Sequence, residues 1–139
     1  MSIVVKDKAG EHIFSLTNFV NKGIEHPVIE YEFYFIYNGF ETKLILDAEL
    51  FDLEDLLKGL MYINNNLKGE CYFEPVMSGR MKIKFGMTDQ GHLDIDGFVY
   101  DASYSIKLSF KFLSDQSFLS DLISGCTITI ASLTENLLG

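Results

Sequence analysis

The residues best suited to chemistry are a histidine and two aspartates that alternate along one short segment. His92, Asp94 and Asp96 are two residues apart, so an extended strand would place all three side chains on one face. Imidazole and carboxylate groups in this arrangement can bind a divalent metal ion. The segments before and after each carry two lysines, which would pair with the same carboxylates across neighbouring strands. We therefore expect a ladder of surface ion pairs and no metal cofactor, with a metal-dependent hydrolase as one alternative.

Other candidate reactive groups are better explained as parts of a core. Cys71 lies beside Tyr72 in an apolar segment, and Cys71 and Cys126 do not have the spacing of metal ligands. We expect two free, buried thiols, as is usual in a reducing cytoplasm. The sequence contains no Gly-x-Ser-x-Gly elbow, no phosphate-binding glycine loop and no His-Glu-x-x-His motif. We therefore predict that the protein is not an enzyme.

A row of aromatic residues alternates along the segment from Val28 to Tyr37. Ile29 and four aromatic residues share one face of that segment if it is a strand, and the aromatic residues are Tyr31, Phe33, Phe35 and Tyr37. Such a row is most often part of a hydrophobic core. It could also line a pocket open to solvent at Tyr31 and Phe35. A small-molecule-binding protein is therefore the second alternative function.

The negative charge of the chain is concentrated in one stretch. The formal net charge is −9, and residues 25–55 contain nine carboxylates but only one lysine. An acidic surface repels phosphate backbones, so we expect no nucleic-acid partner. The N-terminus has no signal-peptide pattern and no apolar run is long enough to span a membrane, so we expect a cytoplasmic protein with no membrane partner.

Hydrophobic periodicity predicts strands in two groups, each followed by a helix. The segment that begins at residue 52 has apolar residues three and four apart, which predicts a helix over 52–68 that Asp52 caps and that Gly69 ends. The longest irregular connection is expected over 18–27, and Asn38-Gly39 is typical of a hairpin turn. The expected strands cover residues 3–5, 12–19, 28–37, 40–49, 71–73, 80–88, 92–99 and 104–112.

The C-terminal segment fits two kinds of element. Leu119, Leu122, Ile123 and Cys126 have helical spacing, whereas Cys126, Ile128 and Ile130 also alternate as in a strand. We favour a helix over roughly 116–136, capped by Asp115 or Ser114. The whole pattern then predicts an α+β fold over residues 1–139 as a single domain. Its sheet is mainly antiparallel, with about eight strands and two helices in the order ββββα-ββββα.

Several local patterns, taken in chain order, resemble the WapI-type immunity proteins. They include the aromatic strand with its Gly-Phe turn from Tyr34 to Phe40, the helix that follows, and the Glu-Cys-Tyr-Phe-Glu-Pro segment that starts at Glu70. They continue with a strand reading Gly-His-Leu-Asp-Ile-Asp-Gly and with Asp-Gln-Ser-Phe-Leu from Asp115. The resemblance covers nearly the whole chain. It implies a small cytoplasmic bacterial protein that binds and blocks a toxin domain, often a nuclease.

The resemblance and the charge pattern together suggest how such a protein would act. The predicted function is non-enzymatic: the chain binds a cognate basic toxin domain through carboxylates that occupy its cleft in place of substrate phosphates. No cofactor is expected. The residues predicted to bind the partner are Glu30, Glu32, Glu41, Asp47, Glu49, Asp52 and Asp55.

Overall fold

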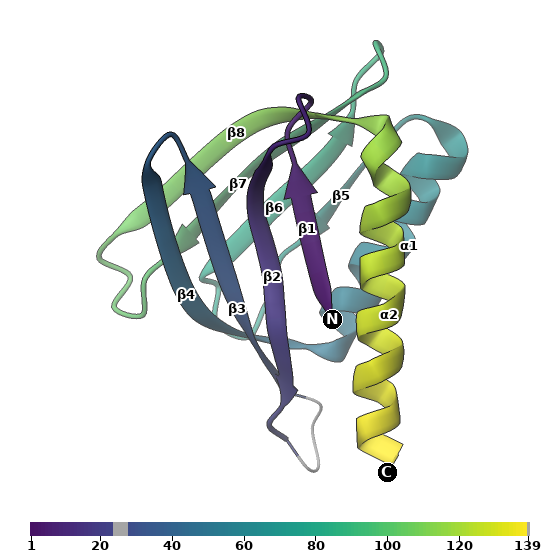
Figure 1. Cartoon of the computed structure of the whole chain (residues 1–139). Helices are drawn as coiled ribbons and strands as arrows, with labels where there is room; N and C mark the ends of the chain where they lie inside the picture. The colour runs from purple at the N-terminus through teal and green to yellow at the C-terminus, as the bar shows by residue number, and fades with distance from the viewer. Residues whose placement is uncertain (24–27, 139) are drawn as a thin grey trace.

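The computed structural model describes residues 1–23 and 28–138, which form the order ββββα twice (Figure 1). The first half consists of β1 (Ser2–Lys6), β2 (His12–Asn21), β3 (Val28–Tyr37), β4 (Phe40–Glu49) and α1 (Leu50–Asn66). The second half consists of β5 (Glu70–Phe73), β6 (Met81–Met87), β7 (His92–Tyr100), β8 (Lys107–Asp115), the short 3-10 helix η1 (Gln116–Phe118) and α2 (Leu119–Leu138). The predicted α+β fold, with its element order, is confirmed.

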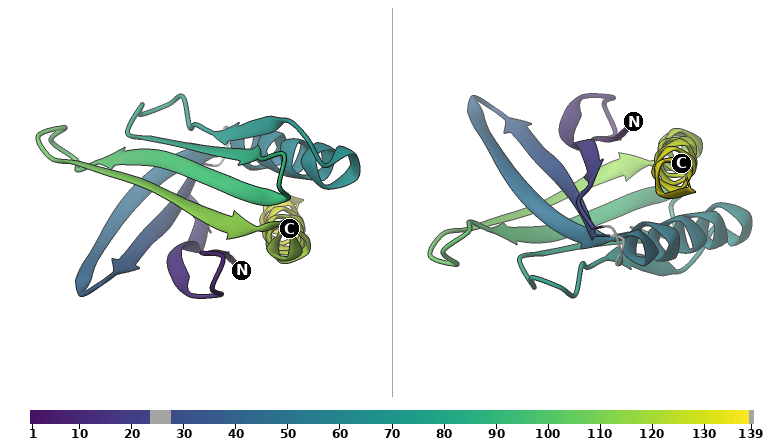
Figure 2. Two further views of the ribbon diagram at one scale, coloured as in Figure 1. Left: turned by 90° about the horizontal axis from the view of Figure 1, so that it is seen from above. Right: turned by 90° about the horizontal axis from the view of Figure 1, so that it is seen from below.

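Each half contributes one four-stranded antiparallel sheet. The strand orders are β1-β2-β3-β4 and β5-β6-β7-β8, so every strand pairs with its neighbour in sequence. Short connections between consecutive strands lead to this meander order. The two sheets face each other, and α1 and α2 lie next to each other along one side of the molecule (Figure 2).

The core lies between the two sheets because their strands alternate apolar and polar residues. Ile29, Tyr31, Phe33 and Phe35 of β3 are buried, and the residues between them point to the outer face. Phe33 is fully buried, and its ring lies 5.6 Å from that of Phe14 in the same sheet and 6.3 Å from that of Phe110 in the other, centroid to centroid. Aromatic rings therefore join the two sheets.

The turn between β3 and β4 has the geometry that its residues predict. Asn38 and Gly39 have φ values of 47° and 81°, the left-handed conformation that both central residues of a type I′ turn require. Tyr37 and Phe40 flank this turn and pair with each other. The two-residue turn fixes the register of β3 and β4, and therefore which side chains face outward.

The first helix begins two residues earlier than expected. Its N-cap is Glu49, and Asp52 stands at the third helical position, where its carboxylate accepts a hydrogen bond of 2.8 Å from the Glu49 backbone N–H. The prediction that Asp52 is the N-cap is therefore wrong. Asp52 lies in the first turn, and its side chain binds the backbone of the N-cap residue that precedes the helix. The helix ends at Asn66 and is closed by Leu67 in a left-handed conformation, two residues before Gly69.

The C-terminal segment is helical, so the alternative of a strand is wrong. Asp115 caps η1 by accepting a hydrogen bond from the backbone N–H of Ser117, and α2 continues from Leu119. The stretch Gln116–Glu135 has a mean hydropathy of 1.3 and is long and apolar enough to cross a membrane, although 28% of it is buried within the fold. Core helices of globular proteins have the same length and composition, so the expected absence of a membrane partner stays a prediction.

Two strands depart most from their predicted bounds. β8 runs from Lys107 to Asp115 and not over 104–112, because the turn after Asp101 includes Tyr104, which has a φ of 60°. β2 continues to Asn21, so the irregular connection is shorter at its start than the predicted span 18–27. A shift in register between Thr17 and Val20, with Asn18 at a φ of 53°, lets the strand continue past the polar residues that indicated a loop. Glu25 and His26 lie outside the residues that the structure describes.

Both helices approach a strand through a glycine. A Cβ atom added at Gly59 of α1 would lie 2.2 Å from the Cβ atom of Cys71 in β5. A Cβ atom at Gly125 of α2 would lie 2.8 Å from the carbonyl oxygen of Ser2 in β1. Glycine at these two positions brings each helix into direct contact with an edge strand, which closes one side of the core.

We expect Gly59→Ala to lower the free energy of unfolding by about 1–3 kcal/mol, since helix and strand must separate to admit the methyl group. The gain in helix propensity of about 1 kcal/mol offsets only part of this cost. Urea unfolding followed by circular dichroism would measure the change, with Lys58→Ala on the exposed side of α1 as the control. A Gly59→Ala variant as stable as the wild type would contradict the close packing of α1 on β5.

Candidate functional site

The carboxylates predicted to bind a partner are mostly brought together on one surface. The outward residues of β3 and β4 form a ladder in which Glu30 lies directly opposite Asp47, and Val28 opposite Glu49. Glu41 is exposed, and the other carboxylate residues of this surface are half-buried. We call this surface the β3–β4 outer face, and its carboxylates are Glu30, Glu32, Glu41, Asp47 and Glu49.

The nearest cations neutralise only part of this charge. Lys22, which follows β2, forms an ion pair of 2.7 Å with Glu30, and this hydrogen bond raises the pKa of Lys22. Lys43, the one cation on β4, has its ammonium 5.4 Å from the centre of the Tyr34 ring. Like charges directly across two strands destabilise a sheet, so the Glu30–Asp47 pair is a cost to folding that Lys22 reduces.

An apolar side chain lies among these carboxylates. Ile45 is 56% exposed, points to the outer face of β4 and pairs with Glu32 across the strands. Its carbonyl oxygen accepts a hydrogen bond from the Arg80 guanidinium, which ties the edge of β4 to the second half of the chain. The β3–β4 outer face therefore combines an exposed apolar group with surrounding carboxylates, as many protein interfaces do.

The two remaining predicted residues lie on α1, and only one is available to a partner. Asp55 is exposed in the first turns of the helix. Asp52 is 6% exposed and is engaged with the Glu49 backbone N–H. Asp52 therefore has a structural role as part of the helix cap, and we leave it out of the candidate surface.

We expect Asp52→Asn to raise the free energy of unfolding at pH 7. Burial raises the pKa of Asp52 above 3.8, and the nearby Glu49 and Asp55 carboxylates add to this effect. The pKa of this carboxyl group is higher in the folded chain than in the unfolded chain. Its contribution to the free energy of unfolding is therefore lost as the pH rises through the pKa of the folded chain. The asparagine oxygen can still accept the Glu49 hydrogen bond without carrying the charge.

The pH dependence of this variant gives the check. Urea unfolding at pH 7 should give a higher free energy of unfolding for Asp52→Asn than for the wild type. The difference should vanish below pH 3.8, where the wild-type carboxyl is neutral. A variant that is less stable than the wild type at pH 7 would mean that the ionised carboxylate stabilises the helix start.

The histidine and two aspartates lie on one face of β7, as predicted, but they do not gather into a metal site. Asp96 pairs in register with Lys84 on one side and Lys111 on the other, yet neither ammonium lies within 4.0 Å of its carboxylate. His92 lies instead 3.8 Å from the Asp115 carboxylate. Among the described residues, no group of three or more metal-ligating side chains is found.

The two cysteines are buried, free thiols. Burial raises the pKa of Cys71 and of Cys126 to about 12, so both are protonated at neutral pH. A protonated thiol is a poor nucleophile and a poor metal ligand. Their place in the core agrees with the interpretation drawn from the apolar residues around them.

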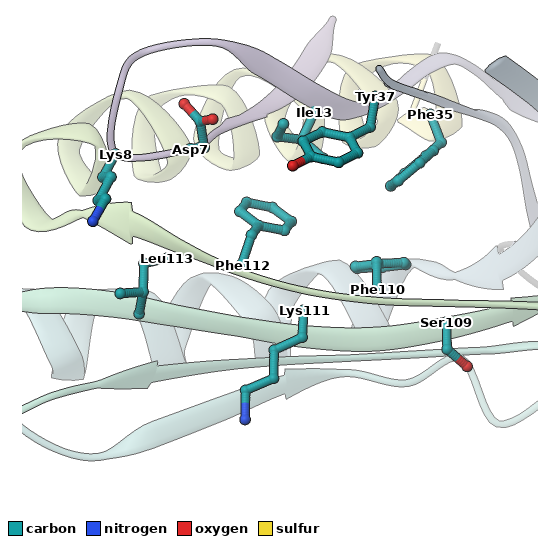
Figure 3. A pocket seen from close by; sticks show the side chains of 10 residues that line it. All are labelled: Asp7, Lys8, Ile13, Phe35, Tyr37, Ser109, Phe110, Lys111, Phe112 and Leu113. Atoms are coloured by element: carbon teal, nitrogen blue, oxygen red, sulfur yellow. The ribbon is translucent and has the colours of Figure 1, made fainter. Parts of the chain in front are cut away.

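A cleft of about 480 Å³ lies between the two sheets (Figure 3). Phe35 and Tyr37 of β3 line it on one side, and Phe110 and Phe112 of β8 on the other. Tyr31, the other residue expected in an aromatic pocket, is 1% exposed and belongs to the core. Phe35 therefore lines a cleft and Tyr31 does not, because facing strands from different halves of the chain form the cleft. Binding of a small molecule there stays a prediction.

Comparisons with known proteins support the fold alone. No family model and no curated protein matches the chain. A solved structure entitled "Structure of the plant transcriptional regulator PBF-2" is similar over 97% of this chain and 81% of its own, with a TM-score of 0.51 and 12% sequence identity. At this identity the likeness shows the arrangement of strands and helices alone.

Proposed function

We propose that the chain is a non-enzymatic immunity-type protein that binds a cognate toxin domain and neutralises it. The observation that carries the proposal is the β3–β4 outer face, where five carboxylates are held together on a two-stranded surface. Two of them, Glu30 and Asp47, are directly opposed at a cost to folding. A binding role gives a reason to keep such a pair.

The proposed mechanism is occlusion of a basic cleft. Carboxylates on the β3–β4 outer face would occupy positions that substrate phosphates take in a nuclease, and Asp55 would extend this charge along α1. Complementary charge accelerates association and selects against wrong partners. The exposed Ile45 would supply apolar contact at the centre of the same surface, where interfaces derive much of their affinity.

The proposal makes the partner a protein and not a nucleic acid. A net charge of −9 with carboxylates on the exposed strands repels a phosphate backbone. The structural likeness to a plant transcriptional regulator does not alter this, because it rests on the fold at 12% identity. In this proposal the protein acts in the bacterial cytoplasm without a cofactor.

Co-expression with a candidate toxin tests this function. The toxin would be the C-terminal domain of a large repeat-rich protein encoded beside this chain, and its gene would be induced in cells with and without the chain. We expect growth to be restored by this protein and a stable complex to be isolated from the cells. Continued killing in the presence of the well-expressed chain, for every neighbouring toxin domain, would overturn the proposal.

A further inference from the structure

The cleft between the sheets is bordered by main-chain groups as well as aromatic rings. Ser109 and Lys111 line it, yet Figure 3 shows their side chains pointing away from the cavity while the ring of Phe112 points into it. The two residues therefore border the cleft through their backbone. β8 is the last strand of its sheet, so this backbone belongs to an exposed edge.

The edge of β8 has hydrogen-bonding groups without partners. At its far end, the carbonyl oxygen of Leu113 accepts a hydrogen bond of 2.8 Å from the Lys8 N–H, which shows that this residue faces away from β7. Backbone groups alternate sides along an antiparallel strand, so those of Ser109 and Lys111 face the same way. Within residues 1–23 and 28–138, no hydrogen bond to these outward groups is found.

The charge of this edge is opposite to that of the whole chain. Lys107 and Lys111 are exposed on β8, and neither has a carboxylate within 4.0 Å among the described residues. Lys107 lies instead over the rings of Phe98 and Tyr100. A strand placed beside β8 would set its own residues opposite these two ammonium groups, where carboxylates stabilise the pairing.

We propose that the edge of β8 and the aromatic cleft beside it bind an extended acidic segment of a partner polypeptide as an added strand. The segment's main chain pairs with the outward groups of Ser109 and Lys111. Its acidic side chains lie opposite Lys107 and Lys111, and the apolar side chains between them point toward the cleft beside Phe110. This site does not depend on the β3–β4 outer face, and the two can fail separately.

A synthetic peptide with the central sequence Glu-Phe-Thr-Val-Glu is the probe, and its binding to the full chain would be titrated by NMR. The alternation places its apolar residues on one face and its carboxylates four residues apart, as Lys107 and Lys111 are. We expect the amide signals of Ser109 and Lys111 to shift and to become protected from hydrogen exchange. A control peptide with lysine in place of both glutamates should bind at least about tenfold more weakly.

Two variants at one position separate main-chain pairing from apolar contact. Ser109→Pro removes an N–H that β7 does not use, and proline is tolerated on edge strands at such positions. It should weaken binding of the acidic peptide about tenfold, whereas Ser109→Val, which keeps the N–H, should leave it unchanged. Thermal unfolding would check that both variants fold. If the proline variant does not fold, protection of the wild-type Ser109 amide from hydrogen exchange on peptide binding tests the main-chain pairing instead.

Three results would overturn the proposal. The first is no shift of the β8 signals by the acidic peptide. The second is equal binding by Ser109→Pro and Ser109→Val, which would mean that the cleft takes apolar groups without strand addition. The third is a wild-type dimer in sedimentation that Ser109→Pro dissociates, which would make a second copy of this chain the occupant of the edge.

Discussion

Replacing Phe33 by alanine is expected to lower the free energy of unfolding by about 3–5 kcal/mol, the range for truncating a buried phenylalanine. The side chain is fully buried and contacts rings from both sheets, those of Phe14 and Phe110. Its removal leaves a cavity between the two halves that the paired strands cannot close. Domains of this size are stable by about 5–15 kcal/mol in total, so the substitution should remove a large share of the stability.

The neighbouring residue on the same strand is the matched control. Tyr34 points to the outer face of β3, and its ring meets the ammonium of Lys43. Tyr34→Ala should cost about 1 kcal/mol or less, since the contact is largely solvated. Urea unfolding of the two variants would measure both values. Equal losses would contradict the assignment of the inner and outer faces of β3.

The strands and the first helix could be predicted from the sequence because their signals are local. The Asn38-Gly39 turn and the alternation around it predict the β3–β4 hairpin with its register, and the structure has both. The start of α1 could not be predicted from apolar spacing, since its cap depends on a contact between Asp52 and Glu49, and Glu49 lies outside the apolar pattern. The same contact explains why Asp52, which looks like a surface carboxylate in the sequence, is buried.

Features made by both halves of the chain could not be predicted. The aromatic cleft joins Phe35 of β3 to Phe110 of β8, residues that only the packing of one sheet on the other brings together. The periodicity of a strand assigns each residue to one face of its sheet, but it does not indicate which residues of the other sheet that face contacts.

Reversing two charges on the β3–β4 outer face is expected to slow toxin binding at least about tenfold, since electrostatic steering sets association rates on that scale. The variant is Glu41→Lys combined with Asp47→Lys. Asp47→Lys places a cation opposite Glu30 in place of a like charge, so it should not harm the sheet. Glu41 is exposed and pairs across the strands with Ile36, and its reversal breaks no ion pair among residues 1–23 and 28–138.

A second double variant controls for net charge. Asp89→Lys combined with Glu135→Lys changes the charge of the chain by the same amount at two exposed positions away from the β3–β4 outer face. This control should associate at nearly the wild-type rate. Circular dichroism of both variants checks that the fold is kept. A difference between the two variants therefore reports where the charge lies and not how much of it there is.

The association rate of the toxin complex at low and high salt tests the central claim most directly. If carboxylates on the β3–β4 outer face steer the encounter, the wild type and the Asp89/Glu135 control should associate rapidly at low salt and slow down as salt is added. The Glu41/Asp47 variant should start slow and depend little on salt, and it should protect cells poorly. An unchanged rate, salt dependence and protection in the Glu41/Asp47 variant would contradict neutralisation through this face.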